Sequence, residues 1–125
     1  MTDHVTTLHH LRALVCAPDG PVLQGYQDAV DVIGATYGQD VALIVLPVER
    51  LTPGFFTLAT GIAGEIVQKF TGYGMQLAIV GDISEHMERS SAFRAFVYEA
   101  NRGRHLWFVA DEAELHTRLG ERAAR

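Results

Sequence analysis

The chain has 125 residues, of which 48% are apolar and 20% are charged, and its net charge is −5. This size and balance predict one globular domain over residues 1–125 and exclude a disordered chain. No apolar run reaches the ~20 residues of a membrane-spanning helix, and residues 1–10 lack the apolar stretch of a secretory signal. Because the charge is acidic, we expect neither nucleic acid nor a membrane as a partner and predict a cytoplasmic protein.

The first third of the chain predicts a β-hairpin followed by a helix. Apolar and β-branched residues form two short segments, residues 5–8 and 11–16, on either side of His9-His10. The apolar residues then recur every three or four positions, which is typical of a helix with one buried face, and this helix is expected to end at Gly38. The face consists of Leu23, Tyr26, Val30, Ile33 and Tyr37.

The rest of the chain alternates between buried strands and helices. Three segments are apolar without alternation, as are strands covered on both faces. They are residues 41–46, 75–80 and 105–110. Thr52-Pro53 predicts the start of a long helix that continues to residue 72. Ser90 or Ser91 is expected to cap the next helix, and Asp111 to begin the last one.

This order of elements, β-β-α-β-α-β-α-β-α, predicts an α/β sandwich. Strands that alternate with helices are joined by right-handed crossovers, which make neighbouring strands parallel. The sequence therefore predicts a mixed, mostly parallel five-stranded sheet with four helices, in which the hairpin supplies one antiparallel strand.

Four segments of the chain carry a resemblance to a known family. They are LTPGFF at residues 51–56, TGIAGEIVQKF at residues 60–70, LAIVGD at residues 77–82 and YEANRG at residues 98–103. Over nearly the whole chain, the sequence resembles a bacterial family described only as domain of unknown function 4180. The resemblance implies a single-domain bacterial protein with no established reaction. The chain departs from the family pattern at Ala100, where we expect serine, and over residues 85–89.

The element order is also similar to that of STAS domains, the fold of anti-sigma-factor antagonists and transporter tails. In those regulators, a phosphorylatable serine lies at the start of the helix after the third strand. The matching segment here, residues 50–56, offers only the hydroxyl of Thr52 and lacks the usual Asp-Ser-Ser-Gly signature. The similarity therefore implies a STAS-like fold but not phosphoregulation.

Ligands of open α/β sheets usually bind beyond the carboxyl ends of the parallel strands. The residues expected there are Glu49, Arg50, Thr52, Asp82, Ser84, Asp111 and Glu112. Three carboxylates at three strand ends could hold a divalent cation, although acidic residues after a strand also cap the next helix. The histidines and the single cysteine do not have the spacing of a zinc site. We therefore predict no metal and no cofactor.

Two glycines interrupt the long helix predicted from Thr52. Gly61 and Gly64 each cost a helix ~1 kcal/mol relative to alanine. Together with Thr57 and Gln68 they form a stripe of small and polar residues beside the apolar face. Packing against another helix, of the same domain or of a second subunit, is the favoured interpretation, and contact with a ligand is the alternative. The predicted binding residues are Thr52, Thr60, Gly61, Gly64, Lys69, Asn101 and Arg102.

Several charged residues are candidates for chemistry or for binding. Glu65 could act as a general base if Asn101 or Arg102 oriented it across the fold. Lys69 is the sole lysine, but nothing near it in sequence would lower its pKa for Schiff-base chemistry. Arg102 and Arg104 complement the dipole at the end of a helix, or they clamp an anionic ligand or an acidic partner.

Two functions remain open. The first is a non-catalytic regulatory or interaction module, paired as a homodimer, that binds a protein partner or a small anionic ligand. The alternative is a small cofactor-independent enzyme that uses acid–base chemistry at Glu65, Asp82 and Glu99. Both hypotheses expect Glu65, Asp82 and Asn101 to gather along one rim of the sheet.

Overall fold

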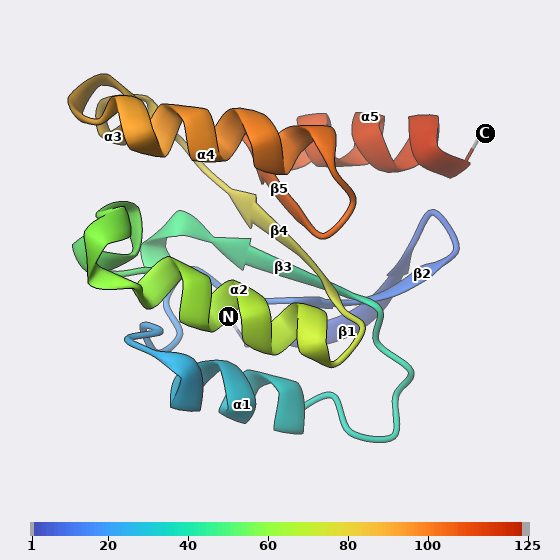
Figure 1. Cartoon of the computed structure of the whole chain (residues 1–125). Coiled ribbons are helices and arrows are strands. Elements are labelled where there is room, and N and C mark those ends of the chain that lie inside the picture. Colours follow the sequence, from blue (N-terminus) through green and yellow to red (C-terminus); the bar gives the residue numbers. More distant parts are fainter. Residues whose placement is uncertain (1, 124–125) are drawn as a thin grey trace.

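The computed structural model describes residues 2–123. Its strands and helices, shown in Figure 1, are β1 (His4–Leu8), β2 (Leu11–Val15), α1 (Tyr26–Gly34), β3 (Leu43–Pro47), α2 (Ile62–Gly72), β4 (Gln76–Val80), α3 (Ser84–Arg89), α4 (Ser91–Arg102), β5 (Leu106–Val109) and α5 (Glu112–Ala123). The strands form one sheet in the order β1-β2-β3-β4-β5. β1 pairs antiparallel with β2, and every other pair is parallel. The predicted α/β fold with a mixed, mostly parallel sheet is confirmed.

The helices divide unequally between the two faces of the sheet. Each parallel strand lies next to the preceding one, so right-handed crossovers place α1, α2 and α4 on the same face. Figure 1 shows these three helices side by side. They form one core with strand residues such as Ile44 and Ile79, whereas α5 packs Leu115 and Leu119 against the opposite face.

The β1–β2 hairpin forms as predicted. His9 and His10 make its turn with positive φ angles of 47° and 73°, as a two-residue turn that matches the twist of the strands requires. The ring of His9 lies 5.5 Å from that of His116 on α5. The tip of the hairpin therefore lies against α5, and Leu8 and Leu11 pack against the core that contains Leu115 and Leu119.

The structure has five α-helices within residues 2–123, not the predicted four. The additional helix is α3, for which no start was predicted. The backbone N–H of Ser84 donates a 2.9 Å hydrogen bond to Oδ1 of Asp82, and this bond holds the turn that begins α3. An aspartate two residues before a short helix is a weak local signal, which explains why the sequence analysis missed it.

The long helix predicted from Thr52 is wrong in its first half. Residues 53–60 form two short 3₁₀ turns, and α2 begins only at Ile62. Gly61 separates them with a φ of +78°, which a continuous α-helix cannot contain. The N-cap position of α2 is Gly61, and the hydroxyl near the helix start is that of Thr60, whose Oγ1 accepts a 3.2 Å hydrogen bond from the N–H of Ile62.

The first helix is shorter than predicted, and only part of its predicted face is buried. α1 ends at Gly34, and Gly38 lies beyond it in a turn with a φ of +77°. Ala29 and Ile33 are buried, but Tyr26 and Tyr37 are 52% and 92% exposed. The apolar spacing suggested a longer helix because tyrosine counts as apolar, although its hydroxyl end is often found in water.

Candidate functional site

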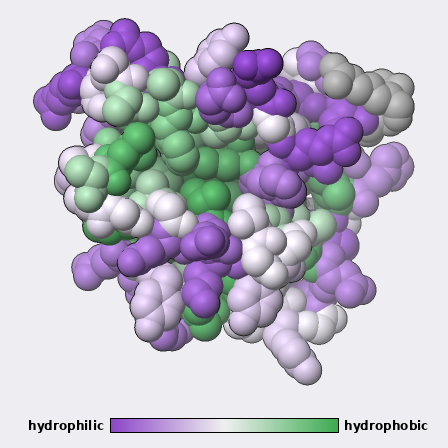
Figure 2. Space-filling view, viewed as in Figure 1, coloured by the Kyte–Doolittle hydropathy of each residue, from purple (hydrophilic) through white to green (hydrophobic). Residues whose placement is uncertain are grey.

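An open groove of about 880 Å³ lies between α2 and α4, and we call it the α2–α4 groove. It is lined by Gly61, Gly64, Glu65, Val67, Gln68, Thr71, Phe96, Glu99, Ala100, Gly103, Arg104, His105 and Leu106. Figure 2 shows hydrophobic side chains, in green, gathered between α2 and α4 with hydrophilic ones around them. The groove is therefore an apolar hollow on the three-helix face of the sheet.

The groove exists because the two helices pack on different neighbours. α2 contacts α1 and β4, and α4 contacts β5. Small residues line the space between them: Gly64 on α2, Gly61 just before it, Ala100 on α4 and Gly103 just after it. Both helices connect parallel strands and run in the same direction, so their last turns lie at the same end of the groove.

Gly64 serves no packing purpose within the described chain. A Cβ atom built on it would meet nothing within 4 Å, and the residue is exposed. Gly61 differs, because its positive φ accounts for the glycine. The favoured interpretation from the sequence was packing against a helix of the same domain or of a second subunit; the first does not apply to Gly64, and a second subunit or a ligand stays a prediction.

The predicted catalytic carboxylates do not form one cluster. Glu65 and Glu99 both line the α2–α4 groove, and both are exposed. Glu99 forms an exposed ion pair of 3.6 Å with Arg102, and such a pair contributes little to stability. Neither carboxylate is desolvated, and desolvation is the usual device that raises a carboxylate pKa for general acid–base catalysis.

Asp82 and Asn101 lie at opposite ends of the parallel strands. Asp82 directly follows β4 and so lies at the carboxyl ends of the strands. Asn101 is in the last turn of α4, which returns the chain to the amino end of β5. Hydrogen bonds from Ser84 lower the pKa of Asp82, the wrong direction for a general base at neutral pH. Asn101 is used structurally, because its Oδ1 accepts a 2.7 Å hydrogen bond from the N–H of Phe108. The expected gathering of Glu65, Asp82 and Asn101 does not occur.

The remaining predicted binding residues lie outside the α2–α4 groove. Lys69 faces the other side of α2, in a hollow of about 530 Å³ bordered by Tyr26 and Tyr73. Its Nζ is 5.5 Å from the ring centre of Tyr26, which is a cation–π distance. Oγ1 of Thr60 accepts a hydrogen bond from the first residue of α2, and Oγ1 of Thr52 is buried without a hydrogen-bond partner among residues 2–123.

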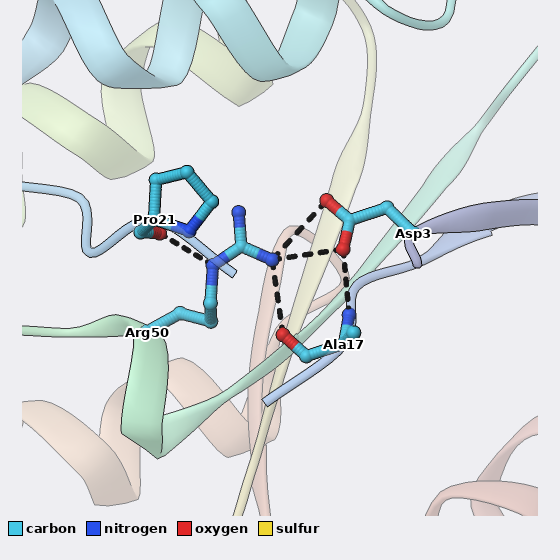
Figure 3. A network of polar contacts seen from close by, with 4 residues as sticks. All are labelled: Asp3, Ala17, Pro21 and Arg50. Atoms are coloured by element: carbon cyan, nitrogen blue, oxygen red, sulfur yellow. Dashed lines mark hydrogen bonds and ion pairs between the residues drawn. The ribbon is translucent and has the colours of Figure 1, made fainter. Parts of the chain in front are cut away.

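Arg50, expected at the ligand-binding rim, is instead 2% exposed and holds the structure together (Figure 3). Its guanidinium donates to both carboxylate oxygens of Asp3, at 2.9 and 3.1 Å, and to the carbonyl oxygens of Ala17 and Pro21. The N–H of Ala17 donates a 2.7 Å hydrogen bond to the same carboxylate. Arg50 therefore ties the start of the chain to the loop after β2.

The other rim residues also have structural roles or remain on the surface. Glu49, Asp111 and Glu112 border a hollow of about 320 Å³ beyond the strand ends. Oδ1 of Asp111 accepts a 2.9 Å hydrogen bond from the N–H of Glu114, so it caps α5 as predicted. Within residues 2–123, no group of three or more His, Cys, Asp or Glu side chains is placed to hold a metal ion.

Cys16, beside this hollow, is buried and its acidity is strongly reduced. Desolvation raises the pKa of its thiol to about 12; the carboxylate of Asp3 adds to this shift, and Arg50 opposes it. The folded protein holds the thiol proton more tightly than the unfolded chain. The resulting stability is complete below about pH 9 and is lost as the pH rises toward 12.

We expect Cys16 to be inert toward iodoacetamide in the folded protein at about pH 8, because the reagent attacks the thiolate and the thiol is buried. The unfolded chain in denaturant should react at the rate of a free cysteine. Mass spectrometry of timed samples measures both rates. Stoichiometric labelling of the native protein as fast as of the unfolded chain would contradict the buried, protonated thiol.

The sequence analysis missed the residues that form the apolar part of the groove. These are Val67, Phe96, Ala100 and Leu106. Phe96 and Ala100 recur at helical spacing and were interpreted only as part of the buried face of a helix, and Gly103 only as the end of that helix. Periodicity alone cannot tell whether a helix face meets the core or borders an open groove.

Comparison with known proteins points to one family. A search of the curated proteins and a search of the solved structures each returned no match. None of the helices among the described residues combines the length and the apolar character that crossing a membrane requires. A family model described as "Domain of unknown function (DUF4180)" matches residues 8–119, which is nearly the whole chain. The chain therefore belongs to this DUF4180 family.

Proposed function

We propose that this protein is a non-catalytic binding module that holds a small molecule in the α2–α4 groove. The ligand has an apolar body, which lies along α2, and an acidic end, which meets Arg104 and His105. The observation that carries the proposal is the apolar hollow beside Gly64, a helical glycine with open space above it.

The size and lining of the groove suit a small apolar body. Its volume of about 880 Å³ lies within the range of ~300–1,000 Å³ for small-molecule sites, which are mostly apolar with few polar groups. Phe96 and Leu106 supply apolar surface opposite the bare backbone at Gly64. A glycine there costs helix stability, so its retention makes sense if a ligand occupies the space of a side chain.

The charges along the groove support an acidic end at one place. Arg104 and His105 follow the last turn of α4, and both are exposed. Arg104 has no carboxylate within ion-pair distance among residues 2–123. Glu65, in the first turn of α2, repels an anion from the other end of the groove, whereas Glu99, in the last turn of α4, is paired with Arg102. An acidic group is therefore attracted to the end formed by Arg104 and His105.

Gly64→Ala is expected to raise the free energy of unfolding by up to about 1 kcal/mol, because the methyl group meets nothing and alanine favours the helix. Gly34→Ala is the matched control: Gly34 is also helical, exposed and open above its Cβ position, but it lies on α1 away from the groove. Urea unfolding of both variants measures the change. If Gly64→Ala alone lost stability, the space above the Cα of Gly64 would not be open as the structure shows.

Binding is tested with decanoate as the probe and decanol as the uncharged comparison, by isothermal titration calorimetry. We expect decanoate to bind more tightly than decanol, Gly64→Leu to abolish binding by filling the groove, and Gly34→Leu to leave it unchanged. The proposal fails if decanoate does not bind, or if Gly34→Leu and Gly64→Leu behave alike. It also fails if light scattering finds a dimer that Gly64→Leu dissociates, because a second copy then covers the groove.

The finer expectations from the sequence stay predictions. They are a homodimer, a regulatory role, a STAS-like fold, bacterial origin and a cytoplasmic location. The acid–base alternative has no supporting observation, since Glu65 and Glu99 are exposed and the pKa of Asp82 is lowered.

A further inference from the structure

A second hollow, of about 340 Å³, lies where α4 ends and β5 begins, and we call it the arginine pocket. It is lined by Arg102, Gly103, Arg104, Trp107, Arg118, Glu121 and Arg122. Four of the ten basic residues of a chain with a net charge of −5 thus meet in one place, with one carboxylate in the lining. Positive charge is concentrated there against the overall acidity of the protein.

Two of the four arginines are held in position. Arg118 donates a 2.6 Å hydrogen bond to the carbonyl oxygen of Asn101, and its guanidinium lies 4.1 Å from the ring centre of Trp107. Arg122 donates to Oε1 of the buried side chain of Gln76. These contacts fix both guanidinium groups before any ligand arrives, so little side-chain entropy is lost on binding.

The other two arginines are exposed and have little to compensate their charge. Arg102 has the exposed ion pair of 3.6 Å with Glu99 and a cation–π contact with Tyr98, whose ring centre is 5.6 Å from the guanidinium. Arg104 forms no ion pair with a carboxylate in the described part of the chain. Desolvation lowers the pKa of Arg118, and the charges of Glu114 and Glu121 oppose this shift. A partly desolvated guanidinium gains more from an anion than a fully hydrated one does.

We infer that the arginine pocket binds the phosphate or pyrophosphate group of a small molecule. Arg118 and Arg122 are the fixed contacts, and Arg102 and Arg104 close over the anion from the surface. Guanidinium groups match phosphate oxygens with paired hydrogen bonds, so four of them favour an anion with several charges over a single carboxylate. A hollow of about 340 Å³ in an acidic protein favours a small anion over nucleic acid, which needs an extended basic surface.

The only tryptophan of the chain reports on this site. Trp107 lies in the pocket beneath Arg118, so an anion that binds the guanidinium groups should change its fluorescence. We expect a saturable change with inorganic pyrophosphate, a weaker affinity for phosphate and none for acetate. Arg102→Ala and Arg104→Ala should each weaken pyrophosphate binding at least about tenfold, the loss of one charge-assisted hydrogen bond.

Arg94→Ala is the matched control, because Arg94 is an exposed arginine of α4 that does not line the pocket. It should leave pyrophosphate affinity unchanged, and circular dichroism should show that all variants fold. The inference is overturned if pyrophosphate gives no saturable change, if Arg94→Ala weakens binding as much as Arg104→Ala, or if only DNA or anionic lipid vesicles bind. Pyrophosphate has no apolar body, so Gly64→Leu should bind it normally, which separates this result from that of the α2–α4 groove.

Discussion

Arg50→Met is expected to lower the free energy of unfolding by about 3–5 kcal/mol, the largest effect that we expect from a polar residue of this protein. The substitution removes the guanidinium that pairs with the carboxylate of Asp3 and that donates to the carbonyl oxygens of Ala17 and Pro21. The loss is large because the side chain of Arg50 is only 3% exposed, although that of Asp3 is 31% exposed. Urea unfolding followed by circular dichroism measures it.

Two further variants separate the network from simple packing. Arg50→Met combined with Asp3→Asn should lose less than the sum of the two single changes, because no unpaired charge remains. Gly20→Ala should also destabilise the protein, since a Cβ on Gly20 would overlap the guanidinium of Arg50. A loss of less than about 1 kcal/mol in the free energy of unfolding of Arg50→Met is typical of a surface ion pair. It would show that the buried network does not stabilise the fold.

Phe93→Ala is expected to destabilise the protein by about 3–5 kcal/mol, as removal of a buried phenylalanine ring does. Phe93 is fully buried, and its ring lies 5.6 Å from that of Phe56 and 5.8 Å from that of Phe108. The cavity would loosen α4 from β5, and with it Phe96, whose ring is 6.3 Å away and which lines the α2–α4 groove.

Tyr98→Ala provides the control for this prediction. Tyr98 lies on the same helix but is 65% exposed, so its removal should change stability by no more than about 0.5 kcal/mol. Thermal and urea unfolding of both variants give the comparison. Equal losses in Phe93→Ala and Tyr98→Ala would mean that the aromatic cluster around Phe93 does not anchor α4.

Features that depend on neighbours in sequence were predicted well. Ser90 accepts a 3.1 Å hydrogen bond from the N–H of Phe93 and caps α4, and Asp111 caps α5 in the same way. The buried strands were visible as continuous apolar runs. The helix predicted from Thr52 was wrong in its first half, because apolar spacing does not reveal that Gly61 adopts a positive φ and interrupts the helix.

The candidate site was predicted only in part. Gly61 and Gly64 were selected as unexpected glycines in a helix, and both line the α2–α4 groove. Asp82 and Asn101 were expected to lie near Glu65. They lie at opposite ends of the strands, because Asp82 follows the end of β4 and Asn101 precedes the start of β5. Arg50 was expected to meet a ligand because it follows a strand, and nothing local indicated that Asp3 would bury it.

The amino-acid order alone determined the alternation of strands and helices, the hairpin and the caps, because these depend on hydrogen bonds and side-chain periods within a few residues. Only the folded chain decided where open space and charge accumulate. The α2–α4 groove brings together Gly64 and Leu106, and the arginine pocket brings Arg102 of α4 together with Trp107 and with Arg118 of α5. Contacts between such distant residues depend on how helices pack on the sheet, which no local pattern records.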